Sequence, residues 1–406
     1  MLIVQKFGGS SVGTPERIKR VAQKVVEDHR AGNKMVVVVS AMGDTTDELV
    51  SLMKEITSNP SEREVDMLLS TGEQVSISLL AMAIKELGCD AVSLTGGQAG
   101  VKTSNIHNKA KIKDIDATRL NTQLDLGKIV VVAGFQGVTP ENEITTLGRG
   151  GSDTSAVALA VALNADLCEI YTDVDGVYTT DPRVVPEASK LKYVSHDEML
   201  EFASLGAQIL HPRSVELAKI YNIPIAVRSS FDFSKEGTIV QEVSKMEKEL
   251  VVSGVAHDDN AARIGLYDVP DKPGIASAIF RSLAAKNIDV DMIIQSAVRN
   301  KVNDISFTIA RDDLRKALSV VEEIQEKIGF SRYAHDEDVS KVSIIGSGMV
   351  SNPGVAATMF EALAGEGVNI EMITTSEIKV SCVVKSKQAN QAVKAIHRKF
   401  ELDAIE

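Results

Sequence analysis

Short apolar runs alternate with longer amphipathic stretches through the first half of the chain, and this pattern predicts strands alternating with helices. The runs at 34–40 and 129–135 are rich in valine, which favours strands covered on both faces over strands with one solvated face. Strands and helices in this order, with glycine loops at strand ends, indicate an α/β layered domain that binds ligands along one sheet edge. The predicted strands are 2–5, 34–40, 91–94, 129–135, 167–172 and 223–227.

Capping residues place the starts of several predicted helices. Thr14 is suited to cap a helix in which Pro15 takes the first position. Polar residues spaced as capping boxes, or following a glycine, mark other starts. These are Ser61 with Glu64, Ser195 with Glu198, and a further helix near Glu73 that follows Gly72 and ends at Gly88.

The second half of the chain contains an internal repeat. Pro273 and Gly274 recur as Pro353 and Gly354, and the match continues without a gap at an offset of 80 residues. A match of this length indicates duplication. Each copy fits a small β-α-β-β-α-β unit with its helices on one face of the sheet. The other matched residues of the first copy are Ala276, Phe280, Leu283, Ala284, Met292, Ile293 and Ser296.

Length and repeats together predict the domain organisation. A chain of 406 residues is too long for one small core, and two or three domains are the prior expectation. The predicted parts are a layered α/β domain at 1–245, a linker or added strand at 246–263, and the two repeat units at 264–337 and 338–406.

Composition narrows the class of protein. Hydrophobic content of 44% with 25% charged residues is that of a globular soluble protein. A net charge of -12 argues against nucleic acid or an anionic membrane as the main partner, but it leaves ATP open. The three cysteines lie far apart without metal-ligand spacing, which predicts a reduced, cytoplasmic protein. No apolar run approaches the ~18 residues that span a bilayer, so we expect neither export nor an anchor.

A glycine-rich stretch at 147–156 has the chemistry of an anion site. Three glycines, Gly148, Gly150 and Gly151, let the backbone approach a ligand closely before a predicted helix whose first turn favours negative charge. Arg149 adds a planar fork that holds a carboxylate or phosphate with two bonds, and Ser152 or Asp153 is suited to cap the helix. The alternative is an ordinary strand-to-helix loop with a surface arginine.

The N-terminal loop has the parts of a phosphate site. A strand delivers Lys6 into a loop with two glycines and two serines, ahead of a helix terminus. The lysine precedes the glycines, so this is not a Walker loop, and the dinucleotide fingerprint G-x-G-x-x-G is absent. We interpret Lys6 as a phosphate-neutralising group, with a plain surface lysine as the alternative.

Two more side chains are candidates for the same edge. Thr45 lies in the loop after a predicted buried strand, where its hydroxyl faces a ligand or simply serves a turn. Glu73 is flanked by apolar residues, which suggests a half-buried carboxylate able to bind an ammonium group. A solvated helix glutamate is an equally good interpretation of that spacing.

The stretch from Thr172 to Arg183 fits a nucleotide edge. Thr172 and Asp173 are placed to meet a sugar or base, Tyr178 to stack, and Arg183 to reach a phosphate. Its acidic spacing does not fit a calcium loop, because the glycine comes too early and no glutamate closes the loop. In the second half, Asp271, Lys272 and Gly274 precede a helix N-terminus, a good place for the carboxylate of an amino acid.

Together the Lys6 to Ser11 motif, the Gly148 to Asp153 motif, the Thr172 to Tyr178 motif and the paired C-terminal units resemble the aspartate kinase family over the whole chain. The resemblance implies an amino-acid-kinase αβα sandwich followed by two ferredoxin-like ACT domains. It further implies ATP with Mg²⁺, transfer of the γ-phosphoryl group to the side-chain carboxylate of L-aspartate, and a product that feeds lysine, threonine and methionine synthesis. Lysine, threonine or both would then bind the ACT domains as inhibitors, and the chain would form a homo-oligomer through them.

The same resemblance assigns roles to residues and implies no protein metal ligands. The catalytic residues would be Lys6, Arg149 and Asp153, and the nucleotide would contact Lys6, Phe7, Gly8, Gly9, Ser10, Thr172, Asp173, Tyr178, Asp181 and Arg183. Aspartate would contact Ser40, Thr45, Glu73, Arg149, Gly150, Gly151, Ser152 and Asp153. Effectors would bind at Asp271, Lys272, Gly274, Ile275, Ala276 and Gln295, facing Asn369 and Ile370 of the other repeat within one chain or across a dimer.

Three alternatives stay open. Another amino-acid kinase, such as one acting on glutamate, shares the sheet and the N-terminal lysine. A non-catalytic amino-acid sensor is a different class, and it fits poorly because Lys6, Arg149 and Asp153 are all present. Finally, if no effector binds the repeats, their sole role would be to hold subunits together.

Overall fold

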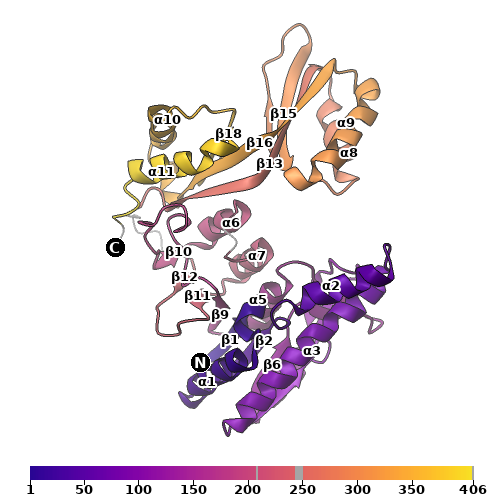
Figure 1. Ribbon diagram of the computed structural model, residues 1–406, viewed down its shortest axis with the longest axis vertical. Coiled ribbons are helices and arrows are strands. Elements are labelled where there is room, and N and C mark those ends of the chain that lie inside the picture. The colour runs from indigo at the N-terminus through magenta and orange to yellow at the C-terminus, as the bar shows by residue number, and fades with distance from the viewer. Residues whose placement is uncertain (207–208, 243–249, 405–406) are drawn as a thin grey trace. The chain divides into compact units, whose positions relative to one another are not determined.

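The computed structural model of the protein describes residues 1–206, 209–242 and 250–404 (Figure 1). Contacts divide the chain into two compact units, and each is described by itself. The first comprises Met1–Val177, Lys190–Ala203 and Gln208–Lys245, and the second comprises Tyr178–Ser189, Ser204–Ala207 and Met246–Glu406. The predicted boundary at 245 and the start of the predicted linker, 246–249, lie outside the described residues.

The first unit is built on an eight-stranded sheet with the order β10-β12-β11-β9-β1-β2-β6-β3. The central strands β11, β9, β1, β2, β6 and β3 are parallel, so their carboxyl ends meet at one edge. The strands are β1 (Leu2–Phe7), β2 (Lys34–Val39), β3 (Ala91–Leu94), β6 (Ile129–Ala133), β9 (Leu167–Thr172), β10 (Tyr193–Val194), β11 (Ile225–Ser229) and β12 (Thr238–Val240).

Helices cover both faces of this sheet and give the predicted αβα sandwich. On one face α1 (Pro15–Arg30) and α3 (Glu62–Glu86) pack together over alternate residues of β1, β2 and β6. On the other face α5 (Gly151–Ala162) contacts β1, β2 and β9 and is itself packed against α7 (Pro212–Tyr221). The valines of β2 are fully buried, as the apolar run predicted. The remaining helices are α2 (Thr45–Ile56), α4 (Thr118–Asp125) and α6 (His196–Ser204).

A second sheet in this unit was not predicted. It has the order β5-β4-β7-β8 and consists of β4 (Val101–Thr103), β5 (Ile112–Ile115), β7 (Gln136–Val138) and β8 (Ile144–Thr146). Strands of three or four residues carry too few apolar positions to show a period. They form because β4 and β5 pair with each other and β4 then meets β7 from a distant part of the chain.

The capping predictions had mixed outcomes. Thr14 Oγ1 accepts a hydrogen bond from Arg17 N at 3.3 Å, and Ser195 and Glu198 cap each other as a box. Ser61 does precede α3, but its side chain makes no capping bond. The prediction of a separate helix after Gly72 was wrong, because α3 runs on without a break. The glycine is explained by packing instead, since a Cβ at position 72 would lie 2.8 Å from the Ala41 methyl group.

Within the described residues, α3 is the one helix long and apolar enough to cross a membrane by length and composition alone. Half of its most apolar window is buried inside the unit. Its inner face carries Asp66, Ser70 and Glu73, all buried. These features are those of a core helix.

The second unit contains one antiparallel six-stranded sheet with the order β14-β15-β13-β16-β18-β17. The strands are β13 (Gly254–Pro270), β14 (Val290–Gln295), β15 (Val302–Ala310), β16 (Arg332–Ile345), β17 (Met372–Thr375) and β18 (Lys379–Lys385). Two helix pairs pack on it, each over its own apolar cluster. The helices are α8 (Ile275–Ala284) with α9 (Leu314–Ile328), and α10 (Val355–Gly365) with α11 (Ala389–Lys399).

The two repeats exchange a strand within this sheet. Residues 261–270 of β13 begin the first β-α-β-β-α-β unit, and the first part of β16 ends it. The rest of β16 begins the second unit, whose sixth strand comes from upstream: Gly254–Asp258 pairs with Lys341–Ile345. The described part of the predicted linker is therefore an added strand from Gly254 onward.

Ion pairs join the repeats reciprocally. Lys341 of the second repeat contacts Asp291 of the first, and Arg263 of the first contacts Glu371 of the second at 3.1 Å. Asp291 and Glu371 are equivalent at the offset of 80 residues. Lys341 is buried and has Asp258 at 3.9 Å as a second acidic partner, so loss of Asp291 would remove the closer of the two charges that compensate it. The two repeats therefore behave as one body.

Candidate active site

The carboxyl edge of the eight-stranded sheet joins β1 to the start of α5. Lys6 Nζ lies 2.6 Å from Asp153 Oδ1, with 12% and 13% of the two side chains exposed. A cation on a strand end and a carboxylate in the first helical turn are thus held in a largely desolvated pair, where electrostatic interactions are stronger than in water.

The loop after β2 reaches the same helix start. Ser40 Oγ donates to Ser152 Oγ at 2.9 Å. Gly134, which follows β6, lies so close that a Cβ there would be 2.8 Å from the Ser152 side chain. The loops after three parallel strands therefore converge on the first turn of α5, and the structure brings the predicted residues Lys6, Ser40, Ser152 and Asp153 together.

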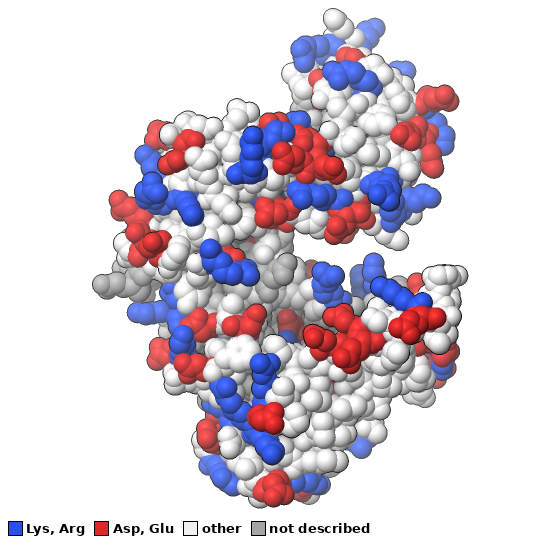
Figure 2. Space-filling model, viewed as in Figure 1, with Lys and Arg blue, Asp and Glu red and all other residues white. Residues whose placement is uncertain are grey.

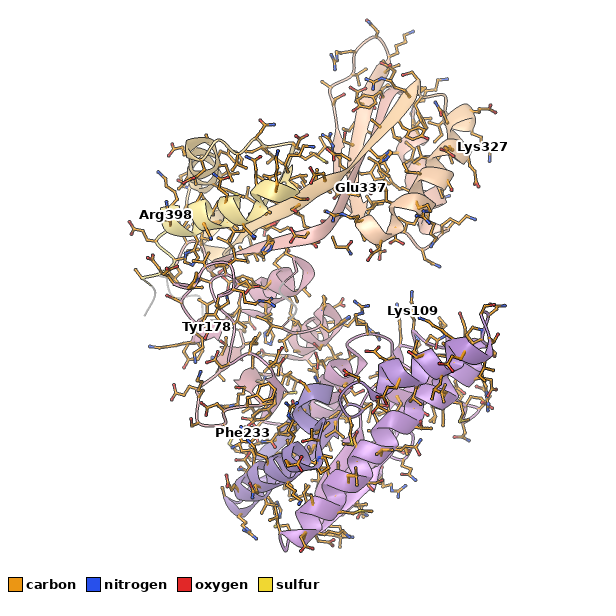
Figure 3. All side chains as sticks on the ribbon, viewed as in Figure 1. Lys109, Tyr178, Phe233, Lys327, Glu337 and Arg398 are labelled. Atoms are coloured by element: carbon orange, nitrogen blue, oxygen red, sulfur yellow. The ribbon has the colours of Figure 1, made fainter. Side chains whose placement is uncertain are left out.

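The two glycines after β1 lie against the loop after β2. Gly43 N donates to Gly9 O at 3.0 Å, and a Cβ on Gly9 would be 2.9 Å from Ala41 O. Gly8, Gly9 and Ser10 are therefore at the predicted edge. Phe7 is different, because its side chain is buried and stacked on Tyr171 at 4.5 Å between ring centroids. Phe233, labelled in Figure 3, is edge-on to both rings. Only its backbone is available to a nucleotide.

Glu73 lies on α3, which covers the face of the sheet opposite to α5. Its Oε1 accepts a hydrogen bond from Ala41 N at 3.2 Å, next to the Gly72 contact that also holds the Thr45 methyl group. The side chain is 3% exposed, and burial raises the pKa of Glu73 to about 7, against the opposing effect of its hydrogen bonds. Gln136 interacts with this carboxyl group and lowers its pKa, but its own bond goes to Ser70 O, and Oε2 makes no hydrogen bond of good geometry among the described residues. A buried carboxylate with a free oxygen is suited to a cationic ligand.

Arg149 stands in a turn shaped by two glycines. Gly148 and Gly150 both have left-handed backbones, with φ of +77° and +69°. Arg149 is exposed, and no carboxylate of residues 1–206, 209–242 and 250–404 lies within ion-pair distance of it. Gly150 caps α5 without a side-chain bond, so the helix start keeps its positive end for a ligand.

We expect Gly150→Ala to destabilise the protein by about 2 kcal/mol. The left-handed backbone alone disfavours alanine, and the new Cβ would lie 2.1 Å from the ring of His211, which caps α7. Urea unfolding measures the loss. Gly127→Ala is the matched control, since Gly127 has φ of +74° with open space around it. Equal losses in the two variants would contradict a packing role for Gly150.

The residues predicted to contact the nucleotide between Thr172 and Arg183 belong to both units. Thr172 ends β9 and Asp173 follows it in the first unit, where Thr172 O accepts a hydrogen bond from Ser230 N at 2.8 Å. Tyr178, labelled in Figure 3, belongs with Asp181 and Arg183 to the second unit. There Arg183 donates from Nε and Nη2 to the carboxylate of Asp181, which holds the pKa of Asp181 below its usual range. Nucleotide contacts by these three residues stay a prediction.

A buried network near the site was missed by sequence analysis. Asp66 on α3 is fully buried and accepts hydrogen bonds from Thr146 Oγ1 at 2.6 Å and Asn108 N at 3.1 Å, with His107 Nδ1 at 2.7 Å. It fixes the loop that packs against Gly148. The sequence signal that could have revealed this network is an aspartate inside an apolar stretch of helix. A buried carboxylate is rare in a protein core, and Glu73 is a second example in the same helix.

The predicted effector residues of the first repeat line a cavity of about 410 Å³. Asp271, Lys272, Gly274, Ile275, Ala276 and Gln295 all contribute to it, together with Asn303. Asn303 is buried, and its Oδ1 has no hydrogen-bond partner in the described part of the chain. Asn369 and Ile370 do not line this cavity, and Ile370 packs on the core of the second repeat, so the prediction that they face the Asp271 loop is not met within one chain.

Comparisons with known proteins agree with this geometry. The model of the amino acid kinase family matches residues 1–229, and the ACT domain model matches 268–325 and 342–400. The aspartokinase of Bacillus sp. (strain MGA3) is 55% identical over 99% of this chain and 97% of its own length. Aspartokinase 2 of Bacillus subtilis (strain 168) is 54% identical over 99% and 98%.

Solved structures show the same architecture. Aspartokinase III of E. coli in complex with aspartate and ADP (R-state) matches with a TM-score of 0.83 and 27% identity, covering 98% of this chain and 99% of that one. Its complex with lysine and aspartate (T-state) matches with a TM-score of 0.78 at 28% identity, over 98% and 99%. The fold and site thus define a kinase of small carboxylic acids with ACT domains. The chain belongs to the aspartokinases of the amino acid kinase family.

Proposed function

We propose that the chain transfers the γ-phosphoryl group of ATP to the side-chain carboxylate of L-aspartate, giving 4-phospho-L-aspartate and ADP, and that this is the first step of lysine, threonine and methionine synthesis. The observation that carries the proposal is the meeting of Lys6, the first turn of α5 and Glu73 at one sheet edge. The E. coli enzyme of the same family has been solved with aspartate and ADP.

The chemistry needs little proton transfer. A carboxylate nucleophile is already ionised at pH 7, so no general base is required, and the obstacle is repulsion between two anions. Lys6 and the N–H groups of the α5 first turn supply positive charge around the transferring group. Asp153 holds Lys6 in place through the 2.6 Å ion pair.

The amino-acid substrate carries three charges that the site matches. Glu73, with its free Oε2, takes the ammonium group, and Arg149 takes the α-carboxylate through its planar fork. Ser40, Thr45, Gly150, Gly151, Ser152 and Asp153 complete the pocket around the reacting carboxylate.

ATP brings Mg²⁺ with it. The described residues contain no group of three or more His, Cys, Asp or Glu side chains suited to a metal ion. Magnesium keeps several waters and binds largely through phosphate oxygens, so the residues present fit an ion carried by the nucleotide. Lys6, Gly8, Gly9, Ser10, Thr172 and Asp173 are the nucleotide contacts we propose.

An acceptor assay tests this function. We expect ADP release that depends on aspartate and is far slower with glutamate, because the second carboxylate of glutamate lies one methylene further from the ammonium. Preference for glutamate would favour the other amino-acid kinases. Absence of aspartate-dependent ADP release would favour a non-catalytic sensor.

We further propose that lysine, threonine or both inhibit by binding the cavity of the first repeat. The carboxylate of the effector would meet the N-terminus of α8, which has no side-chain cap, and its ammonium would meet Asp271 and the free Asn303 Oδ1. The lysine complex of the E. coli relative supports this kind of ligand. A coupling of about 1–3 kcal/mol is enough for inhibition. A dimer formed through the ACT domains is the assembly in which Asn369 and Ile370 reach this cavity.

Asp271→Ala is expected to raise the half-inhibitory effector concentration about tenfold, because it removes a charge-assisted bond to the ammonium group. Initial rates at fixed ATP and aspartate, titrated with lysine, threonine and both, measure this. Asp268→Ala, three residues upstream at the end of β13 and outside the cavity, is the control. Unchanged inhibition in Asp271→Ala would place the effector elsewhere.

A further inference from the structure

The first unit contains a cavity of about 600 Å³ that the proposed function does not use. It lies between α5, α7 and the short strand β5. The residues that line it include none of those predicted to bind aspartate or the nucleotide. The cavity is therefore separate from the candidate active site, although α5 contributes to both.

The cavity is a trough that follows the two helices. Gly150 at the start of α5 packs against His211 at the start of α7, and the helices pack on each other from there (Figure 1). The trough is roughly 10 Å long, with a polar end near the helix starts and an apolar end near their last turns. One stripe of each helix lines it, namely Thr154, Ala158 and Val161 on α5, and Arg213, Leu217 and Ile220 on α7.

Strand β5 adds positive charge to the polar end. Arg213 Nη2 donates to Ala110 O at 3.2 Å, which places the neighbouring Lys111 there, and Lys113 also lines the cavity. Glu216, three residues after Arg213 on α7, supplies a carboxylate. Within the described residues, Lys111, Lys113 and Glu216 make no ion pair. All three charges are therefore available to a ligand.

The other end of the trough is apolar and open to solvent. Ile220 is 67% exposed and Tyr221 57%. Charged side chains of both signs are interspersed over the face of the molecule drawn in Figure 2, so an exposed charge by itself marks no site. Charges of both signs beside an apolar wall in one cavity are a more specific combination, and they are typical of a small-molecule site.

We propose that this cavity binds an α-amino acid with a large apolar side chain, such as leucine. The carboxylate of the ligand would contact Lys111 and Arg213, and its ammonium group would contact Glu216. The side chain of the ligand would lie on Val161 and Ile220 at the apolar end. A zwitterion of this kind needs neighbouring charges of both signs and an apolar wall, and the cavity supplies all three.

Two other occupants match the cavity less well. A nucleotide or another polyanion would be repelled by Glu216 and by Asp114, which also lines the cavity. A strand from another protein would have to pair with β5, which is an edge strand of the small sheet. Lysines on an edge strand, here Lys111 and Lys113, oppose such pairing. The charges therefore favour a small zwitterion.

Arg213 connects the cavity to the candidate active site. Its Nη1 donates to Leu147 O at 2.7 Å, immediately before the turn that carries Arg149 between two left-handed glycines. A carboxylate bound to Arg213 would compete with this bond and loosen the turn. The amino acid should then raise the KM for aspartate several-fold and change the KM for ATP little, a consequence that rests on the proposed function.

A fluorescent reporter tests the binding directly, because the chain contains no tryptophan of its own. In Ile220→Trp, leucine is expected to shift the emission to shorter wavelength in a saturable way, with a dissociation constant on the order of 1 mM. Tyr193→Trp, 61% exposed on β10, is the matched control and should not respond. Equal shifts in the two variants would overturn the proposal.

Isothermal titration of leucine into the parent chain and into Glu216→Gln shows whether the tryptophan itself blocks the cavity. If Ile220→Trp gives no saturable shift and the titrations of the other two proteins are the same, the proposal is wrong. A shift that grows with protein concentration in the absence of leucine would place a second chain in the cavity and would also overturn it.

Neutral variants and a ligand analogue identify the groups that bind. Lys111→Gln and Glu216→Gln should each weaken leucine binding about tenfold. Lys219→Gln should bind leucine normally, since Lys219 lies on α7 outside the cavity and pairs with Asp197 at 2.6 Å. The 2-oxo acid of leucine lacks the ammonium group and should bind about tenfold more weakly than leucine. Equal affinity for the two ligands would contradict an amino-acid site.

Kinetics distinguish this site from the proposed function. Leucine should raise the KM for aspartate in the parent chain and have much less effect on Glu216→Gln. Inhibition by leucine that is unchanged in Glu216→Gln would place its site elsewhere. Binding of leucine at the cavity by a protein that shows no aspartate-dependent ADP release would instead contradict the proposed function and leave the site standing.

Discussion

Lys6→Ala is expected to lower kcat by about 10²–10³-fold while the KM for ATP changes much less. Lys6 is held at the sheet edge by Asp153 and lies where charge develops as the phosphoryl group moves between two anions. A group that acts mainly in the transition state affects kcat more than ground-state binding. Steady-state kinetics with ATP and aspartate varied separately measure both constants.

The ion pair allows a sharper control for this variant. Removing Lys6 leaves the Asp153 carboxylate in a largely buried place without its cation, which would itself disturb the site. Lys6→Ala with Asp153→Asn removes that charge as well. If the double variant regains normal turnover, Lys6 serves only to neutralise Asp153 and has no part in phosphoryl transfer.

Glu73→Gln is expected to raise the KM for aspartate about 100-fold, because the amide loses a charge-assisted bond to the substrate ammonium. The KM for ATP should stay close to its original value. Glu48→Gln, exposed on α2, is the control. A Glu73 variant with normal affinity for aspartate would mean that the ammonium binds elsewhere.

The raised pKa of Glu73 gives this prediction a pH dependence. With a pKa of about 7 before ligand binds, the carboxyl group is mostly protonated at pH 6 and mostly ionised at pH 8. Aspartate should therefore bind more tightly as pH rises from 6 to 8, and the trend should vanish in Glu73→Gln. Isothermal titration at several pH values distinguishes the two proteins.

The stability of the folded protein should fall over the pH range in which aspartate binding becomes tighter. The folded-state pKa lies above the ordinary 4.5, so the folded protein holds the proton more tightly, and stability falls as pH rises from 4.5 through 7. The buried charge then lowers the free energy of unfolding by about 3 kcal/mol. Glu73→Gln should accordingly be stabilised at pH 8 and hardly changed at pH 4.5.

Local patterns were enough to predict the main elements. The valines of β2 and the Thr14 cap each depend on a few neighbouring residues, the repeat is visible in the sequence as a match at an offset of 80, and each appears in the structure. The small sheet of β4, β5, β7 and β8 was not predicted, and for residues 246–263 the sequence left both a linker and an added strand open. The small sheet and the added strand depend on pairing between segments whose own sequences are too short or too polar to show a period.

For the candidate site, too, local properties were predictable from the sequence and long-range contacts were not. The sequence indicated that Lys6, Arg149 and Asp153 lie at strand ends or helix starts, which is a local property. It did not show that Lys6 and Asp153 form an ion pair, that Ser40 meets Ser152, or that Asp66 anchors the adjoining loop. These contacts arise only when parallel strands distant in the chain bring their ends to one edge.

Gly254–Asp258 lies upstream of the first repeat but forms a strand of the second repeat. This arrangement determines which fragments of the protein contain a complete sheet. A fragment starting at 338 would carry the apolar surfaces of two helices, α10 and α11, on a sheet that lacks one edge strand, and should be insoluble. Deleting 261–337 while joining 260 to 338, by contrast, would leave every strand of the second repeat present. The second repeat therefore needs residues 254–258, from upstream of the first repeat, to complete its sheet.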